Sequence, residues 1–444
     1  MTAGRDMASQ SMHQIPDALI GEIHDGNCVA FVGAGFSASV IPPWGKLLND
    51  LAVRSSAATD VANHVESLVQ KGSAHAFDEA AQVLEDHLGR VTFLDQLASL
   101  LTQQDESPMA ERLSWLRGVP FRAILTTNFD PLLPGSTPGS DAYRRVLRPD
   151  SYRWWETRYW GNARGAVTLK LHGDVAKRDV VLTRRDYRRH LYGDPAYTTF
   201  LRTIVATTTV LYMGFSFEDA YLNELRSEVL ALLGQGNDSA PVAYAIVNDV
   251  PPDTQSHFRK HEGIQILSYD TQGGKDFSGF DRYLEGIHQE TNPLVRFGRL
   301  LSTRRLLWID PHPSNNGEAF EYLQAAAAAA DQERSPLVTV STAEEGVVAL
   351  ERAQLDGEPF DLAITHWGDG AAAMPDGSTC SVAVGLLSVI RARDLRCPVL
   401  VFAGAVDVDQ RKRTSLGLGA LAYSWGFADL YRRIEEVVAP GQRV

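Results

Sequence analysis

Short apolar segments recur along the first part of the chain, and the first four of them end in glycine or polar residues. An apolar run of this kind is typical of a buried strand in a parallel sheet. We predict strands at 28–32, 121–130, 166–174, 208–219, 241–247 and 264–269. Apolar residues spaced three or four positions apart predict helices at 15–25, 44–53, 185–206 and 221–233, and Ser37 is expected to open a helix. This alternation favours an α/β fold with a Rossmann-like parallel sheet.

A second domain begins near residue 303. Strands are predicted at 306–310, 337–341, 360–365, 398–403 and 420–423, and helices at 318–331, 343–355, 382–393 and 427–438. Five alternating strand–helix units favour a flavodoxin-like fold for residues 303–444. The first domain is assigned to 15–298, with 58–103 as a helical insertion because its apolar residues keep the helical spacing. The polar residues 1–14 are expected to be disordered.

Length and charge narrow the range of functions. A chain of 444 residues exceeds what one core normally holds, so two or more domains are expected. With 42 basic and 55 acidic residues the net charge is 42 − 55 = −13, which argues against direct nucleic-acid binding. The net charge does not exclude a local basic groove, for which Arg184, Arg185, Arg188 and Arg189 are the best candidate, but a solvated helix face is the favoured interpretation of this run.

Cysteine usage and hydropathy point to a cytoplasmic protein. Only Cys28, Cys380 and Cys397 are present and no CxxC pair occurs, so a four-cysteine zinc site cannot form and no metal is expected. Residues 1–14 lack the apolar core of a signal peptide. No apolar run approaches the ~18–20 residues that span a bilayer, so no membrane partner is expected.

The polar residues at the ends of the strands are the candidate functional residues. They are Gly33–Ser37, Thr126–Asp130, His172–Asp174 and Gly214–Asp219. In open α/β sheets, ligands bind outside the carboxyl ends of the strands, and a glycine turn before a helix suits a phosphate. Asn, Asp and Gly also favour turns, which explains any one of these strand ends without a ligand. Four of them together favour a real site.

These segments resemble Sir2-like domains in order and context. The matching motifs are Gly33-Ala-Gly-Phe-Ser37, Thr126-Thr-Asn-Phe-Asp130, Leu169-Lys-Leu-His-Gly-Asp174 and Gly214-Phe-Ser-Phe-Glu-Asp219. The segment Val181-Leu-Thr-Arg-Arg-Asp-Tyr187 is similar to the prokaryotic branch of NAD-consuming Sir2-like effectors of antiphage defence. The resemblance covers roughly residues 15–290.

The resemblance implies NAD⁺ as the substrate and a role for each motif. It assigns catalysis to His172 and Asn128, and NAD⁺ binding to Gly33, Ala34, Gly35, Ser37, Thr127, Asp130, Gly214, Ser216 and Asp219. A histidine can accept a proton near neutral pH, and an asparagine amide can both donate and accept a hydrogen bond. A lone histidine at a strand end is more often structural, and Asp174 is interpreted as a turn or helix-cap residue.

Departures from the deacetylase pattern favour hydrolysis. The zinc module is missing, and Pro42-Pro43-Trp44-Gly45 lacks the Phe-Arg pair that follows the proline in deacetylases. We therefore expect a regulated NAD⁺ hydrolase, with NAD⁺ depletion as its effect in antiphage defence. Two alternatives remain: a module that binds NAD⁺ or ADP-ribose without turnover, and a protein deacylase. A homo-oligomer and a protein partner or phage-derived trigger are also expected.

The second domain resembles a receiver domain that lacks most of the residues needed for phosphorylation. After its first strand only Asp310 remains of the acidic pair, and Pro311-His312 follows it. His366 stands where the phosphoacceptor aspartate is expected, and no lysine lies near Tyr423-Ser424. We interpret it as a pseudo-receiver used for docking, oligomerisation or sensing. A metal held by Asp310 and His366 is the weaker alternative.

Overall fold

The computed structural model describes residues 15–55, 59–102, 107–137, 146, 166–193, 195–215, 243–312, 316–328, 336–368, 372–373, 379–404 and 406–438. The described chain divides into two compact units, one ending at His288 and one beginning at Gln289. The predicted disorder of residues 1–14 and the helix predicted at 221–233 lie outside the described residues.

The first unit is built on a six-stranded parallel sheet. Its order is β3-β2-β1-β6-β7-β8. The strands are β1 (Cys28–Val32), β2 (Ala123–Thr126), β3 (Val167–Lys170), β6 (Thr209–Met213), β7 (Ala243–Asn248) and β8 (Ile264–Tyr269). Counted along the chain within this sheet, the order is 3-2-1-4-5-6, which is that of a Rossmann fold. The predicted Rossmann-like sheet is therefore confirmed.

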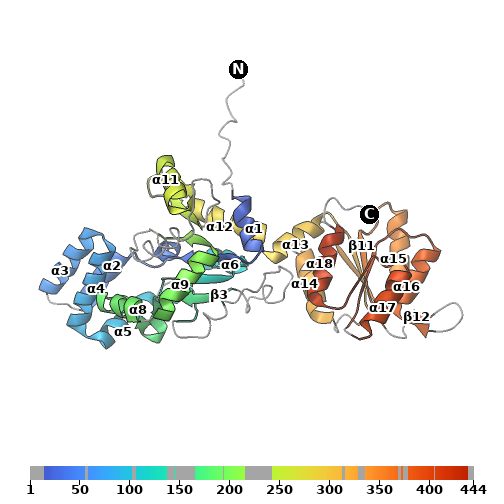
Figure 1. Cartoon of the computed structure of the whole chain (residues 1–444), viewed down its shortest axis with the longest axis horizontal. Helices are drawn as coiled ribbons and strands as arrows, with labels where there is room; N and C mark the ends of the chain where they lie inside the picture. Colours follow the sequence, from blue (N-terminus) through green and yellow to red (C-terminus); the bar gives the residue numbers. More distant parts are fainter. Residues whose placement is uncertain are drawn as a thin grey trace, which may run out of the picture. The chain divides into compact units, whose positions relative to one another are not determined.

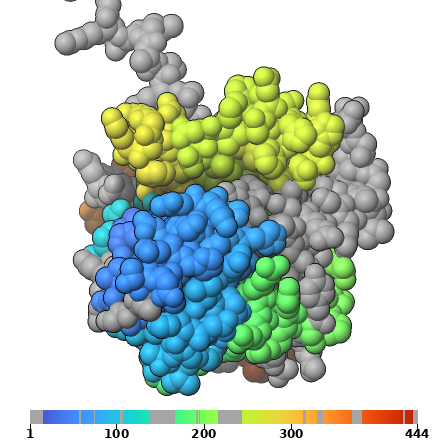
Figure 2. Space-filling view, turned by 90° about the vertical axis from the view of Figure 1, so that its left-hand side faces the viewer, coloured from blue at the N-terminus to red at the C-terminus, as the bar shows by residue number. Residues whose placement is uncertain are grey.

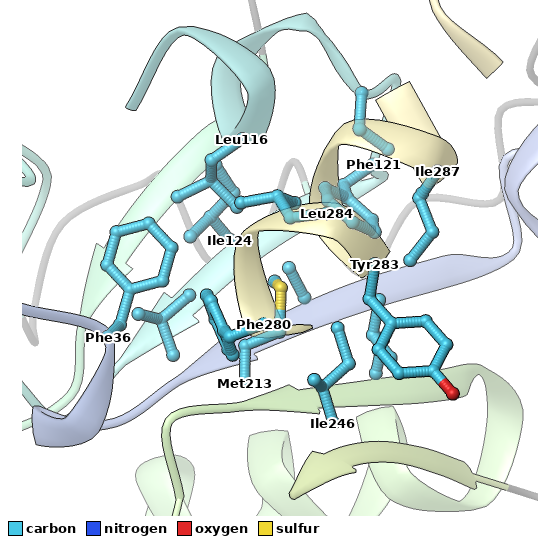
Figure 3. Packing of buried hydrophobic residues seen from close by; sticks show 14 of the residues in the cluster. Phe36, Leu116, Phe121, Ile124, Met213, Ile246, Phe280, Tyr283, Leu284 and Ile287 are labelled. Atoms are coloured by element: carbon cyan, nitrogen blue, oxygen red, sulfur yellow. The ribbon is translucent and has the colours of Figure 1, made fainter. Parts of the chain in front are cut away.

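Both faces of the sheet are covered by helices, because successive strand residues point to opposite faces. On one face, Cys28, Ala30 and Val32 pack against α1 (Asp17–His24), α6 (Ala110–Gly118) and α12 (Ser278–Thr291). Figure 3 shows Phe280 and Leu284 of α12 packed against Ile124 and Met213 of the sheet. On the other face, Val29 and Phe31 pack against α9 (Pro195–Thr207) and α11 (Pro252–Glu262).

The predicted helical insertion has its own core. It comprises α3 (Thr59–Lys71), α4 (Ala74–Leu88) and α5 (Arg90–Thr102), which pack with α2 (Trp44–Arg54) (Figure 1). The same core includes Phe129 after β2 and Val175 and Leu182 after β3. These helices therefore lie against the loops that leave the carboxyl ends of β2 and β3.

The helix α8 (Arg184–Gly193) joins this helical layer. Arg185 pairs with Glu85 and Asp86 of α4, and the blue insertion and green α8 region share one surface in Figure 2. Arg184, Arg188 and Arg189 are exposed, as the interpretation of a solvated helix face requires.

The long helix predicted at 185–206 is wrong as a single element. The structure contains α8 and α9, separated at Gly193–Pro195. Glycine readily ends a helix, and proline is favoured in the first turn of the next one. The helices α6, α11 and α12 were not predicted.

The second unit holds a five-stranded parallel sheet of order β10-β9-β11-β14-β15. The strands are β9 (Leu306–Ile309), β10 (Leu337–Val340), β11 (Leu362–His366), β14 (Val399–Phe402) and β15 (Ala422–Ser424). Within the unit the order is 2-1-3-4-5, which confirms the flavodoxin-like prediction. Its helices are α13 (Pro293–Ser302), α14 (Gly317–Ala328), α15 (Ala343–Leu355), α16 (Val382–Ala392), α17 (Val408–Gly417) and α18 (Phe427–Val438).

The helix α13 packs within the second unit, where the ring of Phe297 contacts Tyr322 and Tyr431. The helix α17 was missed because it buries little apolar surface; Ser415 is its buried residue. None of the helices in the described ranges is long and apolar enough to cross a membrane.

Candidate active site

Four strand ends of the first unit meet at one edge of the sheet. The strand register aligns Lys170 with Thr126, Thr126 with Val32, and Val32 with Met213. The residues that follow these positions therefore form one row at the carboxyl edge. We call this row the strand-end rim, made of Gly33–Ser37, Thr127–Asp130, Leu171–Asp174 and Gly214–Phe215. The predicted binding residues Ser216 and Asp219 lie outside the described residues.

Gly33, Gly35 and Gly214 of the rim pack backbone against backbone. A Cβ on Gly33 would lie 2.6 Å from the Gly214 oxygen, and one on Gly214 would lie 2.1 Å from the Phe36 nitrogen. Gly214 also has a φ of 63°, which other residues rarely adopt. The Gly33 and Gly35 N–H groups donate to the oxygens of Met213 and Gly214 at 2.9 Å. These glycines therefore have a packing role of their own, whatever they bind.

The expected helix at Ser37 is wrong. The chain forms a four-residue 3₁₀ turn at Ala34–Ser37, and the α-helix α2 begins only at Trp44. Pro42 and Pro43 intervene, and a residue before proline is biased away from the helical conformation. A long helix dipole behind the glycines is therefore absent from this turn. Ala34 and Gly35 are exposed at its tip, whereas Ser37 is buried.

Asn128 is fixed by the glycine turn. Its side-chain amide donates to the Gly33 oxygen and to the Ser37 hydroxyl, both at 3.2 Å. Ser37 Oγ in turn lies 3.5 Å from Asp130 Oδ2. Asn128 is 7% exposed, and Thr126 Oγ1 accepts its backbone N–H at 3.0 Å. The amide is thus held in one orientation, with both its N–H donors in use and its oxygen left as an acceptor.

His172 follows β3 on the same rim and is 9% exposed. Its Nδ1 lies 3.4 Å from the Tyr187 hydroxyl of α8, and the two rings meet edge to face at 5.2 Å. When Nδ1 carries the proton, the Tyr187 oxygen accepts it, and Nε2 is then the unprotonated nitrogen that can take a proton. Tyr187 was not among the predicted site residues, although it closes the segment 181–187 that carried part of the resemblance.

Lys170 was also missed, and it lies directly beneath this rim. Its side chain is fully buried, and Nζ lies 2.5 Å from the Asp130 backbone oxygen and 3.6 Å from Asp174 Oδ1. Burial lowers the pKa of Lys170, and the charges of Asp174 and Asp130 oppose that shift. Burial raises the pKa of Asp130, opposed by its hydrogen bond from the Leu132 N–H and by Lys170. The signal that could have indicated Lys170 is the presence of a charged residue within an otherwise apolar strand.

Asp174 has the turn role that was predicted for it. Its carboxylate accepts the Ala176 N–H at 2.9 Å at the start of the 3₁₀ turn Val175–Lys177. This turn joins the two strands of a small hairpin, β4 (Gly173–Asp174) and β5 (Asp179–Val180). Gly173 has a φ of 82°, so the chain makes a sharp turn immediately after His172.

Arg112 of α6 supports the glycine turn from behind. Its guanidinium pairs with both carboxylate oxygens of Asp281 on α12, at 2.6 and 2.9 Å. It also donates to the Phe36 oxygen at 2.6 Å and lies over the rings of Phe36 and Phe280. One side chain therefore connects the turn to two helices.

Replacing Arg112 with leucine should destabilise the first unit by about 2–3 kcal/mol, because the Phe36 oxygen and Asp281 both lose a charged donor. Chemical denaturation of Arg112→Leu, Asp281→Asn and the double variant measures this loss. We expect a coupling of about 1 kcal/mol, since Asp281 is partly exposed. Strictly additive losses would show that the pair does not contribute.

The far end of the sheet carries a further polar group that was not predicted. The Asp249 carboxylate follows β7 and accepts hydrogen bonds from the Asn248 amide and from the Thr271 N–H and hydroxyl. Bonds from Thr271 are the main reason that the pKa of Asp249 is lowered. This group continues the carboxyl edge beyond Gly214.

In the second unit Asp310, which remains of the acidic pair, accepts hydrogen bonds from its own loop. The oxygens of the fully buried Asp310 accept the His312 N–H at 2.8 Å and the Asn316 amide at 2.7 Å. Across the described ranges, no group of three or more histidine, cysteine, aspartate or glutamate side chains could hold a metal ion. The alternative of a metal between Asp310 and His366 therefore has no third ligand among these residues.

The Rossmann order and the polar strand-end rim define an α/β domain of the dinucleotide-binding type. Residues 122–267 match the family described as a SIR2-like domain. The resemblance stated from the motifs is thereby confirmed.

Several curated proteins resemble the chain. It is 28% identical over 217 residues to "NAD(+) hydrolase ThsA" of Enterococcus faecium, covering 47% of this chain and 41% of the relative. It is 22% identical over 329 residues to "Defense-associated sirtuin 2" of Bacillus subtilis, covering 66% of this chain and 30% of the relative. The chain thus spans less than half the length of these curated relatives.

Among solved structures, the Francisella response regulator 1452 receiver domain matches 31% of this chain and 99% of its own, with 15% identity and a TM-score of 0.22.

Proposed function

We propose that this chain hydrolyses NAD⁺ to nicotinamide and ADP-ribose and acts as a regulated effector of antiphage defence. The observation that carries the proposal is the placement of Asn128 and His172 on adjacent strand ends of one rim, within a SIR2-like domain. The names of the relatives, an NAD(+) hydrolase and a defence-associated sirtuin, support the same activity.

Asn128 and His172 are assigned to the same water molecule, which Asn128 orients and His172 deprotonates. Cleavage of the nicotinamide–ribose bond builds positive charge on the sugar, so a well-oriented water can attack the sugar carbon. Asn128 offers its oxygen to one hydrogen of that water, because its amide hydrogens already bind Gly33 and Ser37. His172 Nε2 takes the other proton. Asn128 and His172 each lie two residues beyond the paired positions Thr126 and Lys170, which supports the assignment of both groups to one water.

The glycine turn is assigned to the pyrophosphate. The exposed backbone of Ala34 and Gly35 approaches the phosphates, while Gly33 and Ser37 hold the turn in place. Thr127 and Asp130 flank the nicotinamide ribose from the next strand. Gly214, Ser216 and Asp219 are assigned to the adenosine half. No zinc takes part in this scheme.

The direct test is product analysis. The purified full chain is incubated with NAD⁺, alone and with phage components, and nicotinamide and ADP-ribose are quantified by chromatography. We expect the two products in equal amounts. NAD⁺ recovered intact at one molecule per chain would indicate a sensor, and deacetylation of an acetylated peptide as fast as NAD⁺ loss would indicate a deacylase. Either result overturns the proposal.

Tyr187→Phe should lower kcat about 3- to 10-fold with little change in KM. The variant removes the hydroxyl that accepts the Nδ1 proton of His172 but keeps the edge-to-face ring contact, so the histidine loses its preferred tautomer. Steady-state nicotinamide release measures the effect. Tyr197→Phe, in the α9 core, is the matched control and should keep the native kcat. Equal kcat values for Tyr187→Phe and the native chain would remove Tyr187 from the mechanism.

Regulation is assigned to the second unit and to partners. We infer a cytoplasmic enzyme that assembles into a homo-oligomer and responds to a protein partner or a phage-derived trigger. The pseudo-receiver unit serves as the docking, oligomerisation or sensing module, because Asp310, the one residue left of the acidic pair, already binds its own loop.

A further inference from the structure

Lys170 contacts both catalytic loops, and the proposed reaction has no direct use for it. We propose that Lys170 is a positioning residue that ties the loop carrying Asn128 to the loop carrying His172. The inference rests on the proposed NAD⁺ hydrolysis and adds a requirement to it. Lys170 itself lies beneath the rim and does not touch the reacting atoms.

The location of Lys170 argues against a simple packing role. Its neighbours Leu169 and Leu171 belong to the apolar core, and its own side chain is 0% exposed. Burying an ammonium group is costly unless the group is paired and hydrogen-bonded. An apolar residue would fill the same space at lower cost, so the charge itself has a use.

The first connection reaches the Asn128 loop. Lys170 Nζ donates to the backbone oxygen of Asp130 at 2.5 Å. The Asp130 carboxylate lies 3.5 Å from Ser37 Oγ, and Ser37 Oγ accepts the Asn128 amide at 3.2 Å. All four side chains are at most 7% exposed. A buried polar chain therefore runs from Lys170 to the amide that orients the water.

The second connection reaches the His172 loop. Lys170 Nζ lies 3.6 Å from Asp174 Oδ1, and the other contact of that oxygen is the Ala176 N–H at 2.9 Å. Asp174 thus caps the 3₁₀ turn Val175–Lys177, and it lies two residues after His172. One ammonium group therefore bridges two loops whose backbones are also joined by the Val175 N–H, which donates to the Phe129 oxygen at 3.0 Å.

The charges facing Lys170 come from three segments. Asp174 of β4 and Asp130 after β2 favour the ammonium form, while Lys177 of the 3₁₀ turn opposes it. Burial is the largest effect and lowers the pKa of Lys170. Lys170 therefore loses its proton, and with it the bridge to Asp174, at a lower pH than an exposed lysine does.

Lys170→Met keeps an unbranched, flexible side chain that is one atom shorter, and it removes the charge. We expect kcat for nicotinamide release to fall about 100-fold with KM for NAD⁺ changed less than 3-fold, because a displacement of about 1 Å at the reacting centre costs this much. Leu169→Val is the matched control in the same strand: it trims the core, leaves the polar chain intact, and should keep the native kcat.

Asp174→Asn tests the charge separately. Asparagine still accepts the Ala176 N–H, so the turn is kept, but the negative charge beside Lys170 is lost. The pKa of Lys170 then falls further, and the alkaline limb of the kcat–pH profile moves to lower pH. If Lys170 has only a packing role, this limb stays in its native position. An unshifted alkaline limb in Asp174→Asn would therefore overturn the inference.

Amide hydrogen exchange separates this inference from the proposed function. In Lys170→Met we expect exchange at least about 10-fold faster in both loops, 127–132 and 171–178, and native rates in Leu169→Val. If the native chain releases no nicotinamide, the proposed function fails and the exchange result alone decides the inference. Native exchange in either loop, or native kcat in Lys170→Met, overturns the positioning role while leaving NAD⁺ hydrolysis intact.

Discussion

The His172→Ala variant is expected to release nicotinamide about 10³-fold more slowly than the native chain, in every condition in which the native chain is active. Alanine cannot take the proton from the attacking water, and general-base catalysis typically contributes about 10²- to 10⁴-fold. Affinity for NAD⁺ should change less than about 3-fold, since the imidazole acts on the water and not on the phosphates. Steady-state kinetics and isothermal titration calorimetry measure the two quantities.

The matched control is His87→Ala. His87 is exposed on α4 in the same unit, away from the strand-end rim, and its loss should leave kcat unchanged. Full activity in His172→Ala would contradict the assignment of the base. An equal loss in both histidine variants would point to a general effect of the substitution and not to catalysis.

Gly214→Ala is expected to destabilise the first unit by at least about 3 kcal/mol. The added Cβ would lie 2.1 Å from the Phe36 nitrogen, and the residue must keep a φ of 63°. The conformational strain alone costs about 1–2 kcal/mol, and the backbone contact adds to it because backbone atoms cannot move aside. Separating β1 from β6 would also shift Asn128, so nicotinamide release should fall with stability.

Gly72→Ala provides the control for strain without contact. Gly72 has a φ of 66° and no atom within 4 Å of the position of an added Cβ. Chemical denaturation should show a loss of about 1 kcal/mol for this variant. Equal losses for Gly72→Ala and Gly214→Ala would mean that the close packing of Gly33, Gly35 and Gly214 has no energetic consequence.

The sequence was sufficient to predict the two sheets because their strands are short apolar runs that end in glycine or polar residues. It also predicted which strand ends converge, since parallel strands of one sheet share a carboxyl edge. The motifs then supplied Asn128 and His172, which the structure places on adjacent strand ends. Their roles stay predictions.

The supporting contacts could not be predicted, because they join side chains far apart in the chain. Ser37 and Asp130 are 93 positions apart, and Arg112 and Asp281 are 169 positions apart. No local pattern reports such pairs. Nothing in the strand pattern indicates what Lys170 contacts. The glycines favour a turn or a phosphate site by their sequence, but their close packing between the ends of β1 and β6 is visible only in the structure.

A structure of the His172→Ala variant with NAD⁺ bound tests the central claim most directly. We expect the nicotinamide ribose to lie over the strand-end rim. Its C1′ atom should be within about 6 Å, a distance that one water can bridge, of Asn128 Oδ1 and of the position vacated by the imidazole. The pyrophosphate should contact the Ala34–Gly35 backbone. A nicotinamide ribose bound beyond that reach, or on another edge of the sheet, would contradict the proposed mechanism.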